Sequence, residues 1–404
     1  MQAIHMPSDP NLLEVPVGSL DLGMFVAELD RPWSETPFAL QGFCIREQGD
    51  IDCLRDHCSY VYVDPQRKAR LGTYSKRHAP GKAKRRDSIS IKKEFTQAKV
   101  DFASASQTME KVFTRIHSNR KVDVEVIKSA ITPLIDSVFR NREALAALVR
   151  MKDKDDYYYQ HSVSSAVWAA VLGRHLGMEK KSLVTLALGA SMMDVGMTAI
   201  PDELLNKEGK LDPHEVEEIR AHVKTSVQMM QDAGTRDTKV MDILACHHER
   251  YDGSGYPLGL KSSQIPPMAR IAGLVDTYDA MITNRPHAKA RPSFEAMQEL
   301  GDLKDTLFQG SMVEQFMQTV GMFPTGSVVE LNTGEVGVVV QQNSQRRLRP
   351  RVVILLDSNK RKMPSPTQVD LTSYTSVDQK TPTMWIAKEL NSGAHGIEPE
   401  EYFL

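Results

Sequence analysis

Histidine and aspartate side chains recur at regular intervals through the middle of this sequence. The set consists of His161, Asp194, His222, the adjacent pair His247 and His248, and Asp276. Successive gaps are 33, 28, 25 and 28 residues, so each helix of a bundle could supply one inward-pointing ligand. Imidazole nitrogens and carboxylate oxygens together suit divalent iron, manganese, nickel or zinc. Two such ions bridged by a carboxylate can activate water and stabilise the departing oxygen of a phosphodiester.

The alternative for each single member is ordinary packing. A lone buried histidine is usually a hydrogen-bonded core residue, so neither His161 nor His222 alone indicates a metal. Asp194 is harder to explain in this way, because it follows the apolar residues Met192 and Met193 and a carboxylate there needs a cation or a cap. The whole set therefore predicts a metal site, and core packing in an unrelated helical protein is the disfavoured alternative.

The segment 247–260 predicts a structured loop that begins at the histidine pair. It reads His-His-Glu-Arg-Tyr-Asp-Gly-Ser-Gly-Tyr-Pro-Leu-Gly-Leu, and its glycines and proline interrupt a helix. A second apolar segment, 269–281, follows and contains Asp276 and Asp279. We therefore expect the site at a helix end.

Hydrophobic periodicity divides the chain into four parts. Residues 1–65 contain short β-prone pieces between glycines and prolines, which predict a small β-rich domain. Residues 66–93 hold eleven Lys and Arg and one acidic residue; this is typical of a solvated linker, with binding of a nucleotide, nucleic acid or acidic partner as the alternative. Helical spacing dominates 94–323 and strand-like stretches return in 324–404. The expected fold is mainly α, with a helical bundle flanked by two small β units.

Composition is that of an ordinary globular protein. The 404 residues are 41% hydrophobic and 25% charged, which excludes global disorder. A net charge of -2 argues against a dedicated nucleic-acid or membrane-surface protein. We see no secretory signal, and the apolar run 182–193 is shorter than the ~20 residues of a membrane span. We therefore expect a cytoplasmic protein without a membrane span or a nucleic-acid partner.

The loop and the segment after it resemble the HD-GYP family. The matching motifs are His-His-Glu from 247, Asp-Gly-Ser-Gly-Tyr-Pro from 252, and Arg-Ile-x-x-x-x-Asp-x-x-Asp-Ala from 270. The resemblance implies a metal-dependent phosphodiesterase of the HD superfamily that hydrolyses cyclic di-GMP, a bacterial messenger that controls motility, biofilm formation and virulence. The stretch 20–64 is similar to the small domain that often precedes such modules, and the strand from Gly326 to their C-terminal β extension.

The resemblance implies two divalent metal ions, iron or manganese, in an HD-type helical bundle. The first ion's ligands would be His161, Asp194 and Asp276. The second ion's ligands would be Asp194, His222, His247 and His248. Asp194 would bridge the two ions, and Asp279 would hydrogen-bond the hydroxide between them.

The resemblance also implies where the substrate and partners bind. Gly255, Tyr256 and Pro257 would shape one wall of the substrate site and, in the family, can serve as a docking surface for protein partners. Arg285 stands where the family binds a substrate phosphate, and Lys289 lies close to it. The expected partners are cyclic di-GMP, a protein docked on this loop and a second copy of the chain in a homodimer.

Four positions depart from the family pattern. Met193 stands where the name-giving histidine is expected, and Met197 replaces a lysine that assists at the phosphate or hydroxide. Tyr157 replaces a glutamate that holds a third ion in some members, and Ala288 removes one cation, for which Lys289 is a neighbouring substitute. A thioether is a soft ligand, so the first ion should bind more weakly.

Two hypotheses follow from these departures. One is a phosphodiesterase of weakened activity that converts cyclic di-GMP to linear pGpG or GMP. The other is a degenerate module that binds cyclic di-GMP or a partner protein without turnover.

Overall fold

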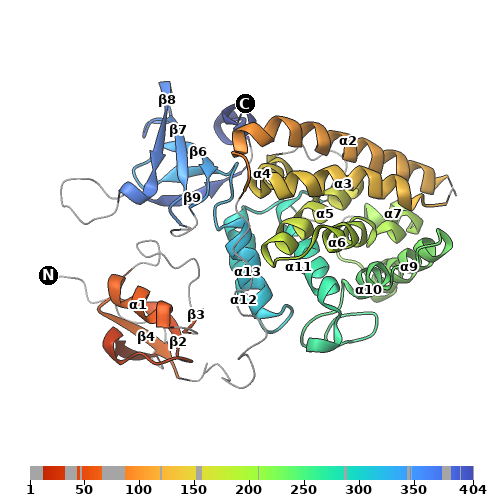
Figure 1. Ribbon diagram of the computed structural model, residues 1–404, viewed down its shortest axis with the longest axis horizontal. Helices are drawn as coiled ribbons and strands as arrows, with labels where there is room; N and C mark the ends of the chain where they lie inside the picture. Colours follow the sequence, from red (N-terminus) through yellow and green to blue (C-terminus); the bar gives the residue numbers. More distant parts are fainter. Residues whose placement is uncertain are drawn as a thin grey trace. The chain divides into compact units, whose positions relative to one another are not determined.

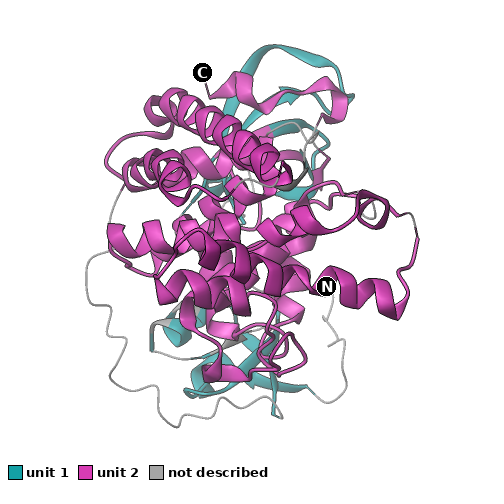
Figure 2. Ribbon diagram, turned by 90° about the vertical axis from the view of Figure 1, so that its right-hand side faces the viewer, with its two compact units in different colours: residues 1–83, 330–337, 341–388 teal, residues 84–329, 338–340, 389–404 magenta. Residues whose placement is uncertain are grey.

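Two compact units make up the chain, and Figure 2 colours them separately. The first contains residues 1–83, 330–337 and 341–388, and the second contains residues 84–329, 338–340 and 389–404. The computed structural model describes residues 12–31, 43–45, 48–65, 87–118, 121–151, 157–207, 209–285, 289–343, 346, 348–374, 384–391 and 393–403.

The N-terminal part is a small antiparallel sheet with strand order β1-β4-β2-β3 (Figure 1). Its strands are β1 (Leu13–Pro16), β2 (Phe25–Leu29), β3 (Phe43–Cys44) and β4 (Tyr60–Asp64). Helix α1 (Gln48–His57), which the strand-like pattern does not predict, buries Ile51 and Leu54 in the core of this sheet. Two core positions in ten residues are too few to give a clear helical period.

The C-terminal part is a five-stranded sheet with strand order β8-β7-β6-β5-β9. Its strands are β5 (Val328–Leu331), β6 (Val336–Gln341), β7 (Arg351–Leu356), β8 (Lys362–Asp370) and β9 (Ile386–Leu390). The return of β structure after the helical part, expected from the strand-like stretches of 324–404, is confirmed.

Between the two sheets in sequence lies a helical bundle, and the expected mainly α fold is confirmed. Its helices are α2 (Ile91–His117), α3 (Val124–Arg140), α4 (Arg142–Met151), α5 (Tyr157–His175), α6 (Lys180–Met192), α7 (Asp202–Leu205), α8 (Pro213–Arg220), α9 (His222–Asp232), α10 (Thr238–Cys246), α11 (Pro267–Ile282), α12 (Ser293–Asp302) and α13 (Gly310–Val320). The domain boundaries at 65, 93 and 323 stay predictions. Residues 66–86 of the predicted linker lie outside the described residues, and α2 begins within its last three residues.

Helix α5 is the central helix of the bundle. It packs against α2, α3, α4, α6, α11 and α13. Residues 163–172 are buried on every side, as expected for a stretch without charged residues. Trp168 packs edge-on against Tyr278 of α11, with ring centroids 5.3 Å apart. This contact fixes the two helices that carry His161 and Asp276.

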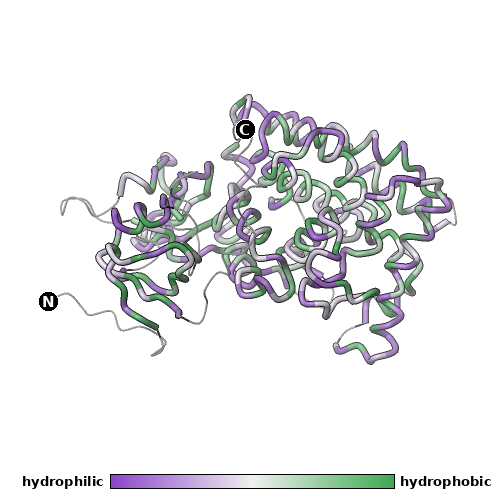
Figure 3. Tube along the Cα trace, turned by 60° about the horizontal axis from the view of Figure 1, so that its bottom comes forward, coloured by the Kyte–Doolittle hydropathy of each residue, from purple (hydrophilic) through white to green (hydrophobic). Residues whose placement is uncertain are grey.

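The surface helices are amphipathic, and their ends follow local capping rules. Figure 3 shows hydrophobic and hydrophilic stretches alternating along the helices. At the start of α8, the Asp212 side chain accepts hydrogen bonds from the backbone N–H of His214 and Glu215, at 2.8 and 3.0 Å. The Glu215 side chain accepts one from the Asp212 N–H at 2.8 Å. This reciprocal pair is a capping box, and Pro213 occupies the first position of the helix.

The end of β9 belongs to the helical unit. The Glu389 side chain accepts hydrogen bonds from Arg150 Nη2 of α4 at 2.7 Å and from Ser327 Oγ at 2.8 Å. It also accepts one from the backbone N–H of Phe294 in the first turn of α12, at 2.8 Å. One buried carboxylate therefore ties three separate chain segments together.

Among the described residues, one helical stretch, Lys180–Ala199, is long and apolar enough to cross a membrane. In the structure 61% of its most apolar window is buried, because α6 packs against α5, α3 and α10 inside the bundle. Length and composition of this kind are shared by core helices of globular bundles.

Candidate metal centre

The six predicted ligands lie together in two groups that share one carboxylate. One group is His161, Asp194 and Asp276. The other is Asp194, His222, His247 and His248. Within each group the potential ligand atoms lie within 4.8 Å of one another. Residues spread over more than a hundred positions are thus brought to one place by α5, α9, α10 and α11.

Asp194 presents one oxygen to each group. Its Oδ1 is 3.2 Å from Nε2 of His222 and 3.4 Å from Nε2 of His247, whereas its Oδ2 is 3.6 Å from Nε2 of His161. This is the geometry that a bridging carboxylate requires, because each oxygen faces a different set of nitrogen donors.

The turn that carries Asp194 approaches α9 closely. Asp194 follows the end of α6 and opens a short 3-10 turn, Val195–Ala199. Within this turn the Gly196 N–H donates to Ser226 Oγ at 2.8 Å. A Cβ on Gly196 would lie 2.2 Å from the backbone oxygen of His222. Only glycine therefore allows Asp194 to reach His222.

Two histidines of the second group direct their Nε2 atoms toward each other and toward Asp194. His222 Nδ1 donates to the Ile219 carbonyl at 2.7 Å, and His247 Nδ1 donates to the Leu244 carbonyl at 3.0 Å. A neutral imidazole that donates through Nδ1 carries a lone pair on Nε2, and these two Nε2 atoms are only 3.5 Å apart. When both imidazoles are neutral, these two lone pairs and the Asp194 carboxylate form a donor set that fits a cation.

In the first group a buried carboxylate orients His161. Asp279 Oδ2 accepts from His161 Nδ1 at 2.8 Å, and its Oδ1 accepts from Trp168 Nε1 at 3.1 Å. His161 Nε2 then lies 3.0 Å from Asp276 Oδ1. A ligand histidine whose second nitrogen is held by a carboxylate is a recurrent feature of metal sites. Trp168 is a functional residue that no sequence signal identified, because it lies in a uniformly apolar stretch.

The electrostatics of the site keep Asp194 ionised and His248 neutral. Burial alone would raise the pKa of Asp194, but hydrogen bonds to His161, His222 and His247 hold it well below its usual range. Burial lowers the pKa of His248 well below its usual range, and the nearby His247 acts in the same direction. His248 is therefore neutral and able to act as a ligand at neutral pH.

The loop after His248 is held by a buried glutamate. Glu249 is 5% exposed and accepts hydrogen bonds from the backbone N–H groups of Leu258 and Leu260, at 2.7 and 2.8 Å. A Cβ on Gly255 would lie 2.4 Å from the His248 carbonyl oxygen, so the loop folds back tightly on the histidine pair. Glu249 belongs to the His-His-Glu motif of the sequence, but no sequence pattern indicated that it anchors the loop.

Tyr256 connects this loop to the second ligand group. Its ring stacks on that of His248, with centroids 4.7 Å apart and planes inclined by 23°. Gly255 and Pro257 flank it at the surface. The three residues predicted as a substrate wall therefore border the ligand cluster.

The other predicted site residues lie apart from the six ligands. Arg285 is exposed after the end of α11, and its side chain makes no hydrogen bond or ion pair with another described residue. Lys289 lines a groove of about 220 Å³ together with Arg150 and Glu389, and none of the six ligands lines that groove. Residues 286–288, including Ala288, and the side chain of Tyr157 lie outside what is described.

Both methionines that depart from the family pattern are shielded from solvent, Met193 fully and Met197 partly. Met193 is 1% exposed, directly before Asp194. Met197 packs against the cluster formed by Ile200, Leu204 and Leu205. Among the described His, Cys, Asp and Glu residues, three supply the first group and four supply the second.

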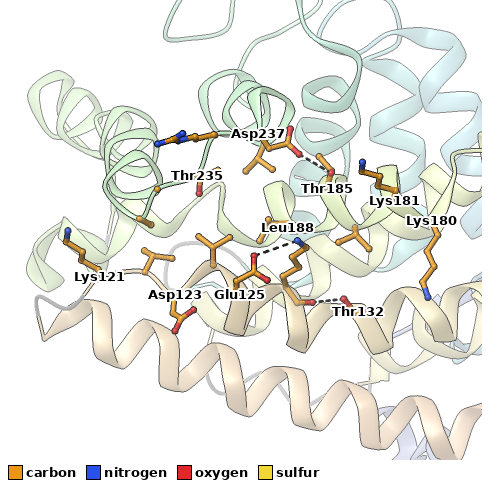
Figure 4. A pocket seen from close by; sticks show the side chains of 18 residues that line it. Lys121, Asp123, Glu125, Thr132, Lys180, Lys181, Thr185, Leu188, Thr235 and Asp237 are labelled. Atoms are coloured by element: carbon orange, nitrogen blue, oxygen red, sulfur yellow. Dashed lines mark hydrogen bonds and ion pairs between the residues drawn. The ribbon is translucent and has the colours of Figure 1, made fainter.

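A groove of about 920 Å³ lies elsewhere on the bundle, between the first turns of α3 and α6 and the turn before α10 (Figure 4). Asp237 accepts from Thr185 Oγ1 at 3.2 Å, and Lys128 lies 3.7 Å from Glu125. None of the six candidate ligands lines this groove.

Comparison with known proteins agrees with this architecture. The family described as HD domain matches residues 140–311, and the KOW domain associated with HD domain matches residues 328–392. A domain of unknown function, DUF3391, matches residues 12–127. The HD domain therefore covers the helical part of the chain from the end of α3 to the start of α13.

Two relatives and one solved structure illustrate the range of similarity. "Cyclic di-GMP phosphodiesterase PA4108" of Pseudomonas aeruginosa is 31% identical over 89% of this chain and 88% of its own length. "3'3'-cGAMP-specific phosphodiesterase 2" of Vibrio cholerae is 31% identical over 39% of this chain and 30% of its own length. The structure of Bd1817, an HDG"Y"P protein from Bdellovibrio bacteriovorus, has a TM-score of 0.46 and 18% identity, and the match covers 76% of this chain and 98% of that one. The chain belongs to the HD-GYP family of phosphodiesterases.

Proposed function

We propose that this chain hydrolyses cyclic di-GMP to linear pGpG or GMP, using two divalent ions, iron or manganese, bound by the two ligand groups. The observation that carries this proposal is Asp194, which offers one oxygen to the Nε2 atoms of His222 and His247 in the second group and the other oxygen to His161. The Pseudomonas relative, similar over almost its whole length, supports the choice of substrate.

Different residues of the ligand groups would have different roles in the reaction. When bound, a pair of divalent ions lowers the pKa of a water molecule and stabilises the departing oxygen. Asp194 would keep the two ions at a fixed spacing, and the neutral imidazoles of His222, His247 and His248 would complete the second site. The role predicted for Asp279 at the hydroxide stays a prediction. Its two hydrogen bonds, to His161 and Trp168, add a positioning role.

On the substrate side, Gly255, Tyr256 and Pro257 would form one wall of the site, and Arg285 and Lys289 would meet a phosphate. We propose the same loop as the docking surface for a protein partner. A homodimer and a cytoplasmic location, with control of motility or biofilm formation through cyclic di-GMP, complete the proposal.

Metal content and turnover on one sample test the proposal. Protein purified without chelator should contain close to two ions per chain by elemental analysis. It should hydrolyse cyclic di-GMP faster than 3'3'-cGAMP when the two are supplied together. His247→Ala is the control, because it removes one nitrogen of the second group. Turnover by the wild type no higher than that of His247→Ala would contradict the proposed phosphodiesterase activity.

A second candidate function is a binding module without turnover. It is favoured by Met193, whose buried thioether stands next to Asp194, where the first group has only three other donors. This candidate predicts binding of cyclic di-GMP that persists in chelator, with fewer than two ions per chain. Hydrolysis at a rate sufficient to clear the messenger in cells would exclude it.

A further inference from the structure

A guanidinium group lies at the rim of the second ligand group. The Arg220 Cζ is 4.8 Å from the centroid of the Tyr256 ring, within the range of a cation–π contact. The same ring stacks on His248 at 4.7 Å. Arg220 is therefore held one aromatic ring away from a candidate metal ligand.

The backbone fixes Arg220 in this place. It is the last residue of α8, and His222 opens α9 two residues later. The carbonyl of Ile219, directly before Arg220, accepts the His222 Nδ1–H at 2.7 Å. The same short stretch thus orients one ligand and presents one cation.

Most hydrogen-bond donors of Arg220 remain available to a ligand. Its Nη1 donates to Glu217 Oε1 at 2.7 Å, and the two side chains are 44% and 69% exposed. An exposed pair of this kind is weak. A guanidinium has five N–H donors, and the described contacts of Arg220 use one of them.

The other arginine near the histidine pair is not available in this way. Arg250 Nη1 donates to the backbone carbonyls of His247 and Glu249, both at 3.1 Å. Its guanidinium also lies over the ring of Phe308, with Cζ 5.3 Å from the centroid. Arg250 therefore supports the loop from inside, whereas Arg220 faces outward beside Tyr256.

A phosphodiester that approaches this site meets several carboxylates. Asp194, Asp276 and Asp279 lie in or directly behind the ligand groups. Two bound divalent ions would offset these charges. An arginine at the rim would add a separate contact to the substrate, because its planar fork matches two phosphate oxygens.

We propose that Arg220 is a substrate-contacting residue that binds a phosphate of the cyclic dinucleotide, with Tyr256 as the support that holds the guanidinium beside His248. This inference rests on the proposed function, since it names a contact of the same site. With both Arg220 and His248 against its ring, Tyr256 serves as a support for these side chains and not as a stacking partner for a base.

Equilibrium binding tests the contact independently of turnover. The probe is a hydrolysis-resistant phosphorothioate analogue of cyclic di-GMP, titrated calorimetrically into protein as purified with its metals. Arg220→Gln should weaken binding about tenfold or more, as expected for loss of a charge-assisted hydrogen bond. Arg220→Lys should fall between this variant and the wild type, because an ammonium keeps the charge without the fork.

Two further variants serve as controls for charge and for position. Glu217→Gln releases Arg220 from its ion pair and should leave binding unchanged or slightly tighter. Arg236→Gln removes an exposed arginine from the groove of Figure 4 and should have no effect. Metal content and unfolding temperature should equal those of the wild type in all four variants. The affinity of Arg220→Gln should depend less on salt concentration.

The possible outcomes separate this inference from the proposed function. A wild type that binds the analogue but does not hydrolyse cyclic di-GMP contradicts the proposed turnover, while the ratio of affinities still decides the role of Arg220. Unchanged affinity in Arg220→Gln, an equal loss in Arg236→Gln, or a loss of metal in Arg220→Gln overturns the contact. A wild type that does not bind the analogue overturns both proposals.

Discussion

The two ligand groups are oriented by contacts of very different range. In the second group, His222 and His247 are each held by a carbonyl three residues earlier in the chain. In the first group, His161 is held by Asp279, which is 118 residues away and is itself held by Trp168. The second group is therefore set by local helix geometry, whereas the first depends on how α5 packs against α11. We expect the first group to be the more sensitive to substitutions outside the ligands.

The largest effect should come from the carboxylate that the groups share. Asp194→Asn keeps the shape of the side chain but removes the negative charge between the two sets of nitrogens. We expect less than one ion per chain and a loss of turnover on the order of 1000-fold, equivalent to about 4 kcal/mol of transition-state stabilisation. Elemental analysis and cyclic di-GMP hydrolysis measure the two quantities. A variant that retains both ions would show that the groups are independent.

The second-largest effect should come from Asp279, the distant residue that orients His161 in the first group. Asp279→Asn leaves one acceptor oxygen for two donors, His161 Nδ1 and Trp168 Nε1. The affinity of the first ion should fall about 10–100-fold, as for other residues that orient metal ligands, while the second ion is unaffected. A two-step manganese titration followed by calorimetry resolves the ions. Asp232→Asn, at an exposed site on α9, is the matched control, and an equal loss there would contradict the comparison.

Adding a nitrogen donor to the first group should bring its affinity for a metal ion closer to that of the second group. Met193→His places an imidazole directly before Asp194 in a buried position of similar volume. The affinity of the first ion should rise by about tenfold, or about 1.4 kcal/mol, and turnover should rise with it. The same manganese titration measures the gain. No change in the first ion would mean that position 193 cannot reach this group.

The smallest effect is a pH dependence of the metal-free protein. Burial lowers the pKa of His222, but the hydrogen bond to Asp194, the negative charge of Asp194 and the hydrogen bond to Ile219 together outweigh burial and raise the pKa above its ordinary value of 6.5. The stability that His222 contributes is therefore full below pH 6.5 and is lost as the pH rises through its raised folded value. Asp194, with its lowered pKa, contributes above its ordinary value of 3.8 and loses this contribution as the pH falls through its folded value.

Chelator-treated protein tests the predicted direction in which the contribution of His222 to stability changes with pH. The difference in unfolding free energy between the wild type and His222→Gln should be largest between about pH 4 and 6.5 and should shrink toward pH 8. A difference that grows from pH 6 to pH 8 would mean that His222 is neutral in the folded state.

Much of the fold and of the ligand set is predictable from the sequence. Apolar residues at helical spacing marked the bundle, because this period follows directly from helix geometry. Strand-like stretches marked the return of β structure after residue 324. The interval of about one helix between His161, Asp194 and His222 predicted that they would meet. The distances then showed that Asp194 divides its oxygens between the groups.

The supporting residues were not predictable in this way. Trp168 gives no signal in an apolar helix, since its single polar atom matters only when α11 brings Asp279 to it. Arg220 looked like any charged residue near a helix end. Its position over Tyr256 depends on a loop that returns from more than thirty residues later. Contacts between residues so far apart in the sequence arise from tertiary packing, which local sequence patterns do not predict.

The buried carboxylate of Glu389 has a consequence for how such proteins can be recombined. The last strand of the β sheet ends in a residue that neutralises Arg150 of the helical bundle. A gene rearrangement that exchanged the β extension without a carboxylate at this position would leave a buried guanidinium unpaired, at about 3–5 kcal/mol. An exchange that keeps the bundle stable would therefore have to carry the end of β9 with it, although the sheet looks like a separate module along the chain.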